Sequence, residues 1–280
     1  MKLKAISCDY SIICKTKNAG CVYPYFRSAN GDKIITTISP HHGRSFVIQQ
    51  NSEGKYVVSK GNGLSYTQYP ILNTREFGDN TWGILLKKDA IRDFILGQEI
   101  SNLGIKTNTM EYVIELEKII PLPNGHKIKP ILLQYTVECP YRICDMAFMS
   151  SLQIKYEIEK WKSFKTKNKE PYLIAAEIII RNLRILHSNN ILHNAIHVQN
   201  LTWALELLDF EIASSPKYPY DKETYNSYVQ DLFPREILYT YEIINYIAWC
   251  LNENIDYKKI DFIFKEYGFN LELFSTERNI

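Results

Sequence analysis

The sequence contains no long hydrophobic run and no excess of charge of one sign. No uninterrupted apolar stretch reaches the roughly 18 residues that a membrane-spanning helix needs, and the apolar run that follows Met1 is too short and too interrupted for a signal peptide. The 33 basic and 31 acidic side chains leave a formal net charge of +2, which creates no strong field to attract nucleic acid. We therefore expect a cytoplasmic protein that binds neither nucleic acid nor a membrane.

Metal-binding cysteine motifs are also missing. None of the six cysteines forms a Cys-x-x-Cys pair, and no pair of histidines stands beside them at the spacing of a zinc site. Three cysteines, Cys8, Cys14 and Cys21, cluster near the N-terminus and leave a redox or disulfide role open. The interpretation that we favour is that the cysteines are small buried hydrophobes in a reducing compartment.

The first half of the chain has the pattern of a β-sheet interrupted by one helix. Two β-prone runs flank the turn signal Asn51-Ser-Glu-Gly54, which predicts a hairpin. Asp89 is a possible helix cap, and Gly104 stands just beyond the expected helix end. The expected strands are 45–50, 55–60, 82–87, 111–119 and 129–137, and the expected helix is 89–103.

The second half is predicted to be mainly helical. Helices are expected at 171–188, 225–252 and 257–267, with loops and short strands at 191–208. A hinge near 138–141 would divide the chain into a sheet-rich N-lobe (1–138) and a helical C-lobe (139–280). This pattern predicts an α+β, two-lobed fold with 45% apolar residues to form its core, and the cleft between the lobes is the default ligand site.

The segment from Ile191 to Ala213 carries the most specific motif. His193 precedes Asn200 by seven residues, and Asp209 follows an apolar run. Protein kinases place a His-Arg-Asp-x-x-x-x-Asn loop and an Asp-Phe-Gly turn at such a spacing. Amide and carboxylate oxygens are ligands that Mg²⁺ prefers. Asn200 and Asp209 are therefore predicted to hold Mg²⁺, with Mn²⁺ as an alternative, and the metal would bridge the phosphates of ATP.

Two residues of the first half complete this hypothesis. Lys60 ends the strand 55–60, where a kinase-like fold keeps its phosphate-binding lysine. Glu99 lies in the following helix, and its carboxylate is expected to pair with Lys60. Taken singly, each is equally well interpreted as an ordinary surface residue.

Two segments of the chain resemble the selenoprotein O family, a branch of the protein-kinase-like fold. They are Lys60-Gly-Asn-Gly63 and residues 83–107, which are similar to a Leu-Lys-Gly-x-Gly strand end and an Arg-Glu-Phe-Leu-x-Ser-Glu-Ala-x-x-x-Leu-Gly-Ile-Pro-Thr helix. The family's His-Gly-x-x-Asn-Thr-Asp-Asn loop and Asp-Tyr-Gly turn align without gaps on 193–211. The resemblance runs patchily from about residue 55 to residue 213, and family members are much longer than this chain.

The resemblance implies an enzyme that binds ATP in a flipped orientation and transfers AMP to hydroxyl groups of proteins. A protein, a peptide or a small molecule is the expected acceptor. The loop 41–45 is a further expected phosphate contact. The residues that the resemblance assigns to the nucleotide or the metal are Lys60, Glu99, Arg92, Arg142, Asn200 and Asp209.

Several positions depart from the motifs. Ala195 and Gln199 occupy the two usual places of the aspartate base, and Glu211 replaces the glycine of the turn. His197 is the candidate to replace the base or to contact phosphate, with a packed or solvent-facing histidine as the equally weighted alternative. The departures keep open a pseudokinase that acts as a nucleotide-binding or scaffolding module. Phosphate transfer to a small molecule is the third alternative.

Overall fold

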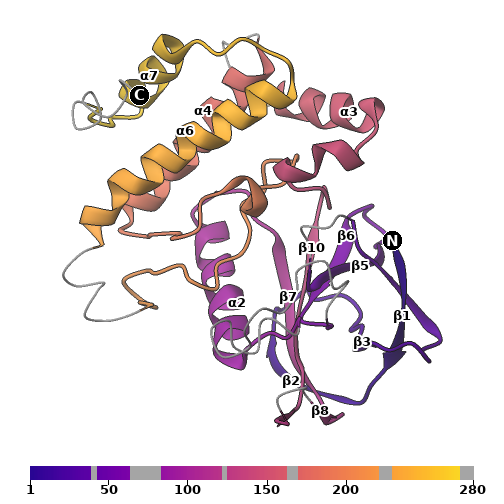
Figure 1. The fold of residues 1–280 in the computed structure, drawn as a ribbon. Coiled ribbons are helices and arrows are strands. Elements are labelled where there is room, and N and C mark those ends of the chain that lie inside the picture. Colours follow the sequence, from indigo (N-terminus) through magenta and orange to yellow (C-terminus); the bar gives the residue numbers. More distant parts are fainter. Residues whose placement is uncertain (39–42, 64–82, 122–124, 163–169, 221–228, 272–280) are drawn as a thin grey trace.

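The computed structural model describes residues 1–38, 43–63, 83–121, 125–162, 170–220 and 229–271 (Figure 1). Its main sheet has eight strands in the order β2-β7-β10-β6-β5-β4-β1-β3, and neighbouring strands are antiparallel. A separate two-stranded ribbon joins β8 (Ile120–Pro121) to β9 (Lys127–Ile128). The strands of the main sheet are β1 (Lys2–Ser7), β2 (Tyr10–Lys15), β3 (Tyr25–Arg27), β4 (Lys33–Thr36), β5 (Ser45–Gln50), β6 (Tyr56–Lys60), β7 (Thr109–Leu116) and β10 (Ile131–Val137).

The predicted hairpin is confirmed as β5 and β6. Its turn is held by Asn51, whose Oδ1 accepts hydrogen bonds from the backbone N–H groups of Glu53 and Lys55 at 3.0 and 2.9 Å. Gly54 has φ +78°, a conformation that glycine adopts at little cost. The strands β1 to β4 were not predicted, because they are short and half exposed and so lack a regular apolar pattern.

The helix α2 (Lys87–Asn102) contacts β7 and β10. It begins two residues before the predicted start, and Leu86 precedes it without any side-chain cap, so the expected cap at Asp89 is wrong. Gly104, with φ +80°, follows its C-terminal end as predicted. The strand expected at 82–87 is reduced, within its described part, to a single bridge between Leu85 and Ile131.

The helices of the second half pack above the sheet in Figure 1. The predicted helix 171–188 is confirmed at both ends, whereas the helix predicted from 225 begins only at Phe233, beside Pro234. Residues 225–228 lie outside the described part. A 3₁₀ turn, η2 (Ile143–Phe148), follows the expected hinge. The helices of the second half are α3 (Ser151–Trp161), α4 (Pro171–Ser188), α6 (Phe233–Cys250) and α7 (Tyr257–Glu266).

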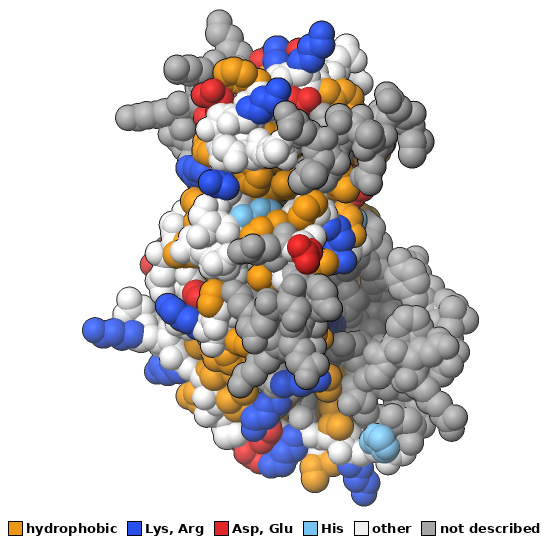
Figure 2. All heavy atoms as spheres, turned by 90° about the vertical axis from the view of Figure 1, so that its left-hand side faces the viewer, with side chains coloured by type: hydrophobic (Ala, Val, Ile, Leu, Met, Phe, Trp, Pro, Cys, Tyr) orange, Lys and Arg blue, Asp and Glu red, His pale blue; other side chains and the backbone are white. Residues whose placement is uncertain are grey.

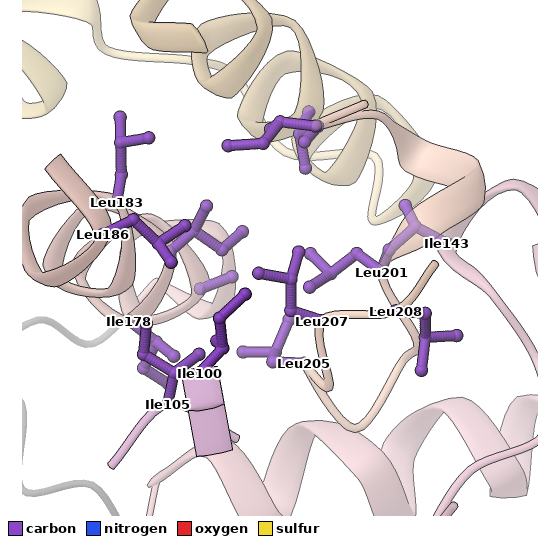
Figure 3. Close-up of a cluster of buried hydrophobic side chains, with 14 of the residues drawn as sticks. Ile100, Ile105, Ile143, Ile178, Leu183, Leu186, Leu201, Leu205, Leu207 and Leu208 are labelled. Atoms are coloured by element: carbon purple, nitrogen blue, oxygen red, sulfur yellow. The ribbon is translucent and has the colours of Figure 1, made fainter. Parts of the chain in front are cut away.

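A hydrophobic core connects these helices to the loop that carries the motif. Figure 3 shows Leu201, Leu205 and Leu207 of the loop in the same buried cluster as Leu183 and Leu186 of α4. All five side chains are buried, so burying them stabilises the loop by on the order of 2 kcal/mol for each side chain. The sheet followed by helices confirms the predicted α+β class.

The surface carries mixed charge. On the face shown in Figure 2, basic and acidic side chains of the described residues are interspersed. No helix in the part of the chain that the structure describes is long and apolar enough to cross a membrane. The six cysteines, all of them described, are free thiols, and only Cys139 and Cys250 are buried.

Candidate functional site

The turn after Leu208 places Asp209 beside α2. Asp209 has φ +67°, in the left-handed region that non-glycine residues seldom adopt. The next residue, Phe210, is fully buried, and its N–H donates to the Asp93 carboxylate at 3.1 Å. The ring of buried His193 packs edge-on against Phe210, and its Nε2 lies 3.0 Å from the Leu208 carbonyl oxygen. Packing and hydrogen bonds together therefore fix the direction of the Asp209 side chain.

Lys60 lies at the centre of the site. Its ammonium is 2.8 Å from Asp209 Oδ1, 3.1 Å from Asp93 Oδ2 and 2.5 Å from Glu211 Oε1. The Lys60 side chain is 3% exposed, and a buried charge is tolerated only when it is paired. One cation thus joins strand β6, helix α2 and the turn after Leu208.

These contacts change the acidity of the groups involved. Burial alone would lower the pKa of Lys60, but the three carboxylates outweigh it and raise that pKa above its usual range. Burial also opposes the charged form of Asp209, yet Lys60, Arg44 and Arg142 hold its pKa well below the ordinary value. Asp93 differs, because burial exceeds the effect of Lys60 and raises its pKa to about 6. Asp209 therefore carries a permanent negative charge near neutral pH.

A second cation, Arg44, binds the turn from the segment before β5. Its Nη2 lies 2.8 Å from both carboxylate oxygens of Glu211, and its Nη1 donates to the Ile84 carbonyl at 3.3 Å. The loop 41–45 was expected to contact phosphate. Its residues 41 and 42 lie outside the described part, and Arg44 is bound to a carboxylate of the chain itself.

Asn200 lies next to Asp209, because the backbone N–H of Leu208 donates to the Asn200 carbonyl at 2.9 Å. Its side chain is engaged on both ends. The amide Nδ2 donates to the Ala195 carbonyl at 2.9 Å, and the amide oxygen accepts from the Arg142 guanidinium at 3.3 Å. The structure thus brings together the two predicted metal ligands, Asn200 and Asp209, but places a cation beside each of them, Arg142 at Asn200 and Lys60 at Asp209.

Three carboxylates around Asp209 are a further set of candidate donors for a divalent metal. Asp93, Asp209 and Glu211 each offer a carboxylate oxygen, and these oxygens lie within 4.8 Å of one another. Such hard oxygens are the ligands of Mg²⁺ and Mn²⁺. Cations lie beside both sets of donors, Arg142 beside the Asn200 oxygen and Lys60 beside the three carboxylates, so the metal roles of Asn200 and Asp209 stay predictions.

The space beneath β5 is small. A cavity of about 10 Å³ lies between Phe46, Val58 and Tyr135 on the sheet and Leu208 on the loop. That is about the room of one water molecule, whereas ligand pockets typically offer about 300–1,000 Å³. The buried Nε of Arg142 has no hydrogen-bond partner among the described residues. A nucleotide therefore fits beneath β5 only if the surrounding side chains move.

The expected ion pair between Lys60 and Glu99 is wrong. Glu99 lies on another face of α2, where its carboxylate accepts a hydrogen bond from the Ser215 hydroxyl at 2.9 Å. Asp93, six residues earlier, takes the place beside Lys60. Six residues correspond to about 600° of helical rotation, so the two acids point in directions about 120° apart.

Arg92 binds the segment that follows the turn. Its guanidinium donates to the carbonyl oxygens of Ala213, Tyr218 and Pro219 at 3.1–3.2 Å. It also lies over the Tyr218 ring, 4.6 Å from the centroid. The nucleotide contact expected of Arg92 stays a prediction, and in this structure Arg92 anchors the segment after the turn to α2.

The residues considered for proton transfer lie on the surface of the loop. His197 is exposed, and its Nδ1 accepts a hydrogen bond from the Gln199 N–H at 3.4 Å, where it begins the short turn η4 (Val198–Asn200). Ala195 provides no titratable group. His197 is thus open to an acceptor, and its role as base stays a prediction.

One buried acid was missed at the expected hinge. Glu206 accepts hydrogen bonds from the backbone N–H groups of Glu138 and Cys139 at 2.8 and 3.3 Å, and from the Thr202 hydroxyl at 2.9 Å. Burial raises the pKa of Glu206 to about 7. This carboxyl group ties residues 138–139 to the motif loop.

A sequence signal for Asp93 exists. The family helix quoted above carries a glutamate directly after its arginine, and Asp93 directly follows Arg92. Glu206 and Arg44 have no comparable signal, because their partners are backbone amides and a carboxylate more than 60 residues away in the chain. Only the tertiary structure brings these groups together.

No protein-family model matches this chain, and no curated protein does. Among solved structures, the chain is similar to the crystal structure of a Toxoplasma gondii specific rhoptry antigen kinase domain. The two share 11% sequence identity over 85% of this chain and 76% of that one, with a TM-score of 0.44. At this level the similarity supports no conclusion about activity.

Proposed function

We propose that this protein is a kinase-like transferase that binds ATP with Mg²⁺ or Mn²⁺ and moves AMP to a hydroxyl group. The observation that carries the proposal is the position of the Lys60 ammonium, held by Asp93 from α2 and Asp209 from the turn. A lysine paired with a helix acid, next to a metal-binding aspartate, is the arrangement by which kinase-like folds hold phosphates.

The charges of the site suit phosphoryl chemistry. Asp209 is ionised and can bind the metal that neutralises the phosphates. In AMP transfer, the acceptor oxygen forms a bond to the α-phosphorus, pyrophosphate leaves, and the hydroxyl proton passes to His197 or to solvent. Phosphoryl transfer depends mainly on positioning and charge neutralisation, so the missing aspartate at Ala195 slows this reaction without preventing it.

Isotope labelling tests the proposal. The protein is incubated with Mg²⁺ and ATP labelled either at the α- or at the γ-phosphorus. Label from the α-position alone, on the protein or on an added acceptor, indicates AMP transfer, whereas label from the γ-position indicates phosphate transfer. We expect Asp209→Asn to lose incorporation at least tenfold. A folded wild type that incorporates no more label than Asp209→Asn would contradict transferase activity.

A second function, a pseudokinase that serves as a binding module, is favoured by a different observation. Arg142 donates a hydrogen bond to the side-chain oxygen of Asn200, and the cavity beneath β5 has room for only about one water molecule. A larger pocket of about 440 Å³ lies between the β5–β6 turn, residues 138–141 and α3, and it would suit a peptide. Thermal-shift titration separates the two functions, since a ligand that binds the native state raises its stability. No shift with any nucleotide and metal would favour the module.

A further inference from the structure

Glu211 stands where the kinase and selenoprotein O turns carry glycine. The Glu211 side chain is 10% exposed, and its carboxylate bridges Arg44 and Lys60. The Arg44 guanidinium lies 2.8 Å from both carboxylate oxygens of Glu211, and Lys60, at the end of β6, contacts Oε1 of the same carboxylate. The glutamate at this position therefore places a carboxylate between the guanidinium of Arg44 and the ammonium of Lys60.

The two cations make a pocket suited to phosphate. A guanidinium that contacts two oxygens of one group, together with a buried ammonium, matches the geometry of phosphate recognition as well as that of carboxylate recognition. Both cations come from the sheet, from β6 and from the residue before β5, while the carboxylate comes from the turn after Leu208. The cations therefore remain together when the turn moves away.

We infer that Arg44 and Lys60 form an anion site for phosphate groups, and that Glu211 is its resident anion, which a ligand must displace. This inference rests on the proposed function and adds the regulation of its site: the cleft is held closed by its own carboxylate. Arg44 becomes the residue that recognises the phosphate after Glu211 has left.

The need to displace Glu211 from Arg44 and Lys60 lowers the apparent affinity of the protein for phosphates. A ligand binds only the fraction of molecules in which Glu211 has left the cations, so the measured affinity falls by that fraction. The displaced carboxylate regains water. Lys60 keeps Asp93 and Asp209 as partners, and the Arg44 guanidinium exchanges the Glu211 carboxylate for the phosphate. Any event that draws Glu211 to another partner would therefore open the site.

Tripolyphosphate is the appropriate probe, because it has the three phosphates of ATP but no adenine ring, which would have to fit into the small cavity beneath β5. Glu211→Gln keeps the shape of the side chain and removes its charge, and Glu211→Gly restores the glycine of the motif. By isothermal titration calorimetry, we expect both variants to bind tripolyphosphate at least tenfold more tightly than the wild type. Adding Arg44→Gln to Glu211→Gln should abolish that gain.

A matched control comes from β7. Glu111 is a buried carboxylate that accepts hydrogen bonds from the Gly20 N–H at 3.3 Å and from the Gln134 amide at 2.7 Å, so Glu111→Gln should leave the tripolyphosphate affinity unchanged. Should Glu211→Gln fold poorly, Glu211→Gly, checked by circular dichroism, carries the same expectation, and tripolyphosphate should raise the melting temperature of either variant more than that of the wild type.

Each outcome decides one of the two hypotheses. Equal tripolyphosphate affinity in the wild type and both Glu211 variants, or a gain that survives Arg44→Gln, overturns the anion site. A gain for tripolyphosphate without ATP binding or label transfer by any variant supports the anion site and contradicts the proposed transferase. A gain for tripolyphosphate together with label transfer from ATP supports both hypotheses, whereas a gain with ATP binding but no label transfer supports the anion site and contradicts the transferase.

Discussion

The ammonium of Lys60 lies 2.8 Å from the Asp209 carboxylate, although the two residues are 149 positions apart in the chain. Asp93 and Glu211 contact the same ammonium. The sheet, helix α2 and the motif loop are therefore joined by one buried cation. Both the stability of this protein and its capacity to bind an anion depend on how these charges are balanced.

Asp93 and Glu99 offer a test within one helix. Asp93→Asn should lower the free energy of unfolding by on the order of 2 kcal/mol, because it removes a buried charge partner of Lys60. Glu99→Gln should cost less than about 0.5 kcal/mol, since glutamine can still accept from Ser215. Urea denaturation measures both. Equal losses would contradict the assignment of Asp93 as the partner of Lys60.

Removal of the central cation should have the largest effect. Lys60→Met leaves three carboxylates without their common partner, and we expect a loss of roughly 3–5 kcal/mol. Lys87→Met is the control, because Lys87 is half exposed and contacts Glu115 only at 3.4 Å; surface pairs contribute up to about 1 kcal/mol. A Lys60 variant as stable as the Lys87 variant would refute the central role of Lys60.

Gly61 holds the end of β6 close to β10. An added Cβ would lie 2.3 Å from the Ile131 carbonyl oxygen, and Gly61 has φ +100°. Gly54 also has a positive φ, but no atom lies within 4 Å of its added Cβ. Gly54→Ala should therefore cost about 1–2 kcal/mol from backbone strain alone, while Gly61→Ala should cost at least about 2 kcal/mol more. Thermal denaturation of the two variants gives the comparison.

Glu206 should make stability depend on pH. Its pKa rises from 4.5 to about 7 on folding, so the folded state keeps a proton that the unfolded state releases. Its stabilising contribution is complete below pH 4.5 and is lost as the pH rises through 7. The expected loss is on the order of 2 kcal/mol. Denaturation at pH 5 and pH 8 should show this loss in the wild type and a smaller one in Glu206→Gln; identical slopes would refute it.

The sequence alone determined the elements with strong local signals. The turn of Asn51 and Gly54, the end of α2 at Gly104 and the apolar helix α4 follow from hydrogen-bonding side chains, glycine conformation and periodicity. Each of these signals acts over a few residues. The order of sheet and helices, and hence the α+β class, follows from them.

The composition of the site was decided by tertiary structure. The sequence spacing of the motif was enough to identify His193 and Asp209 as candidates, because a short loop joins the two residues and fixes their separation. The choice of Asp93 over Glu99 depended on which face of α2 is turned toward the Lys60 side chain, and the pairing of Arg44 with Glu211 joins residues 167 positions apart in the chain. Local signals carry no information about such contacts, since long-range packing sets the rotation of a helix and the balance of buried charges.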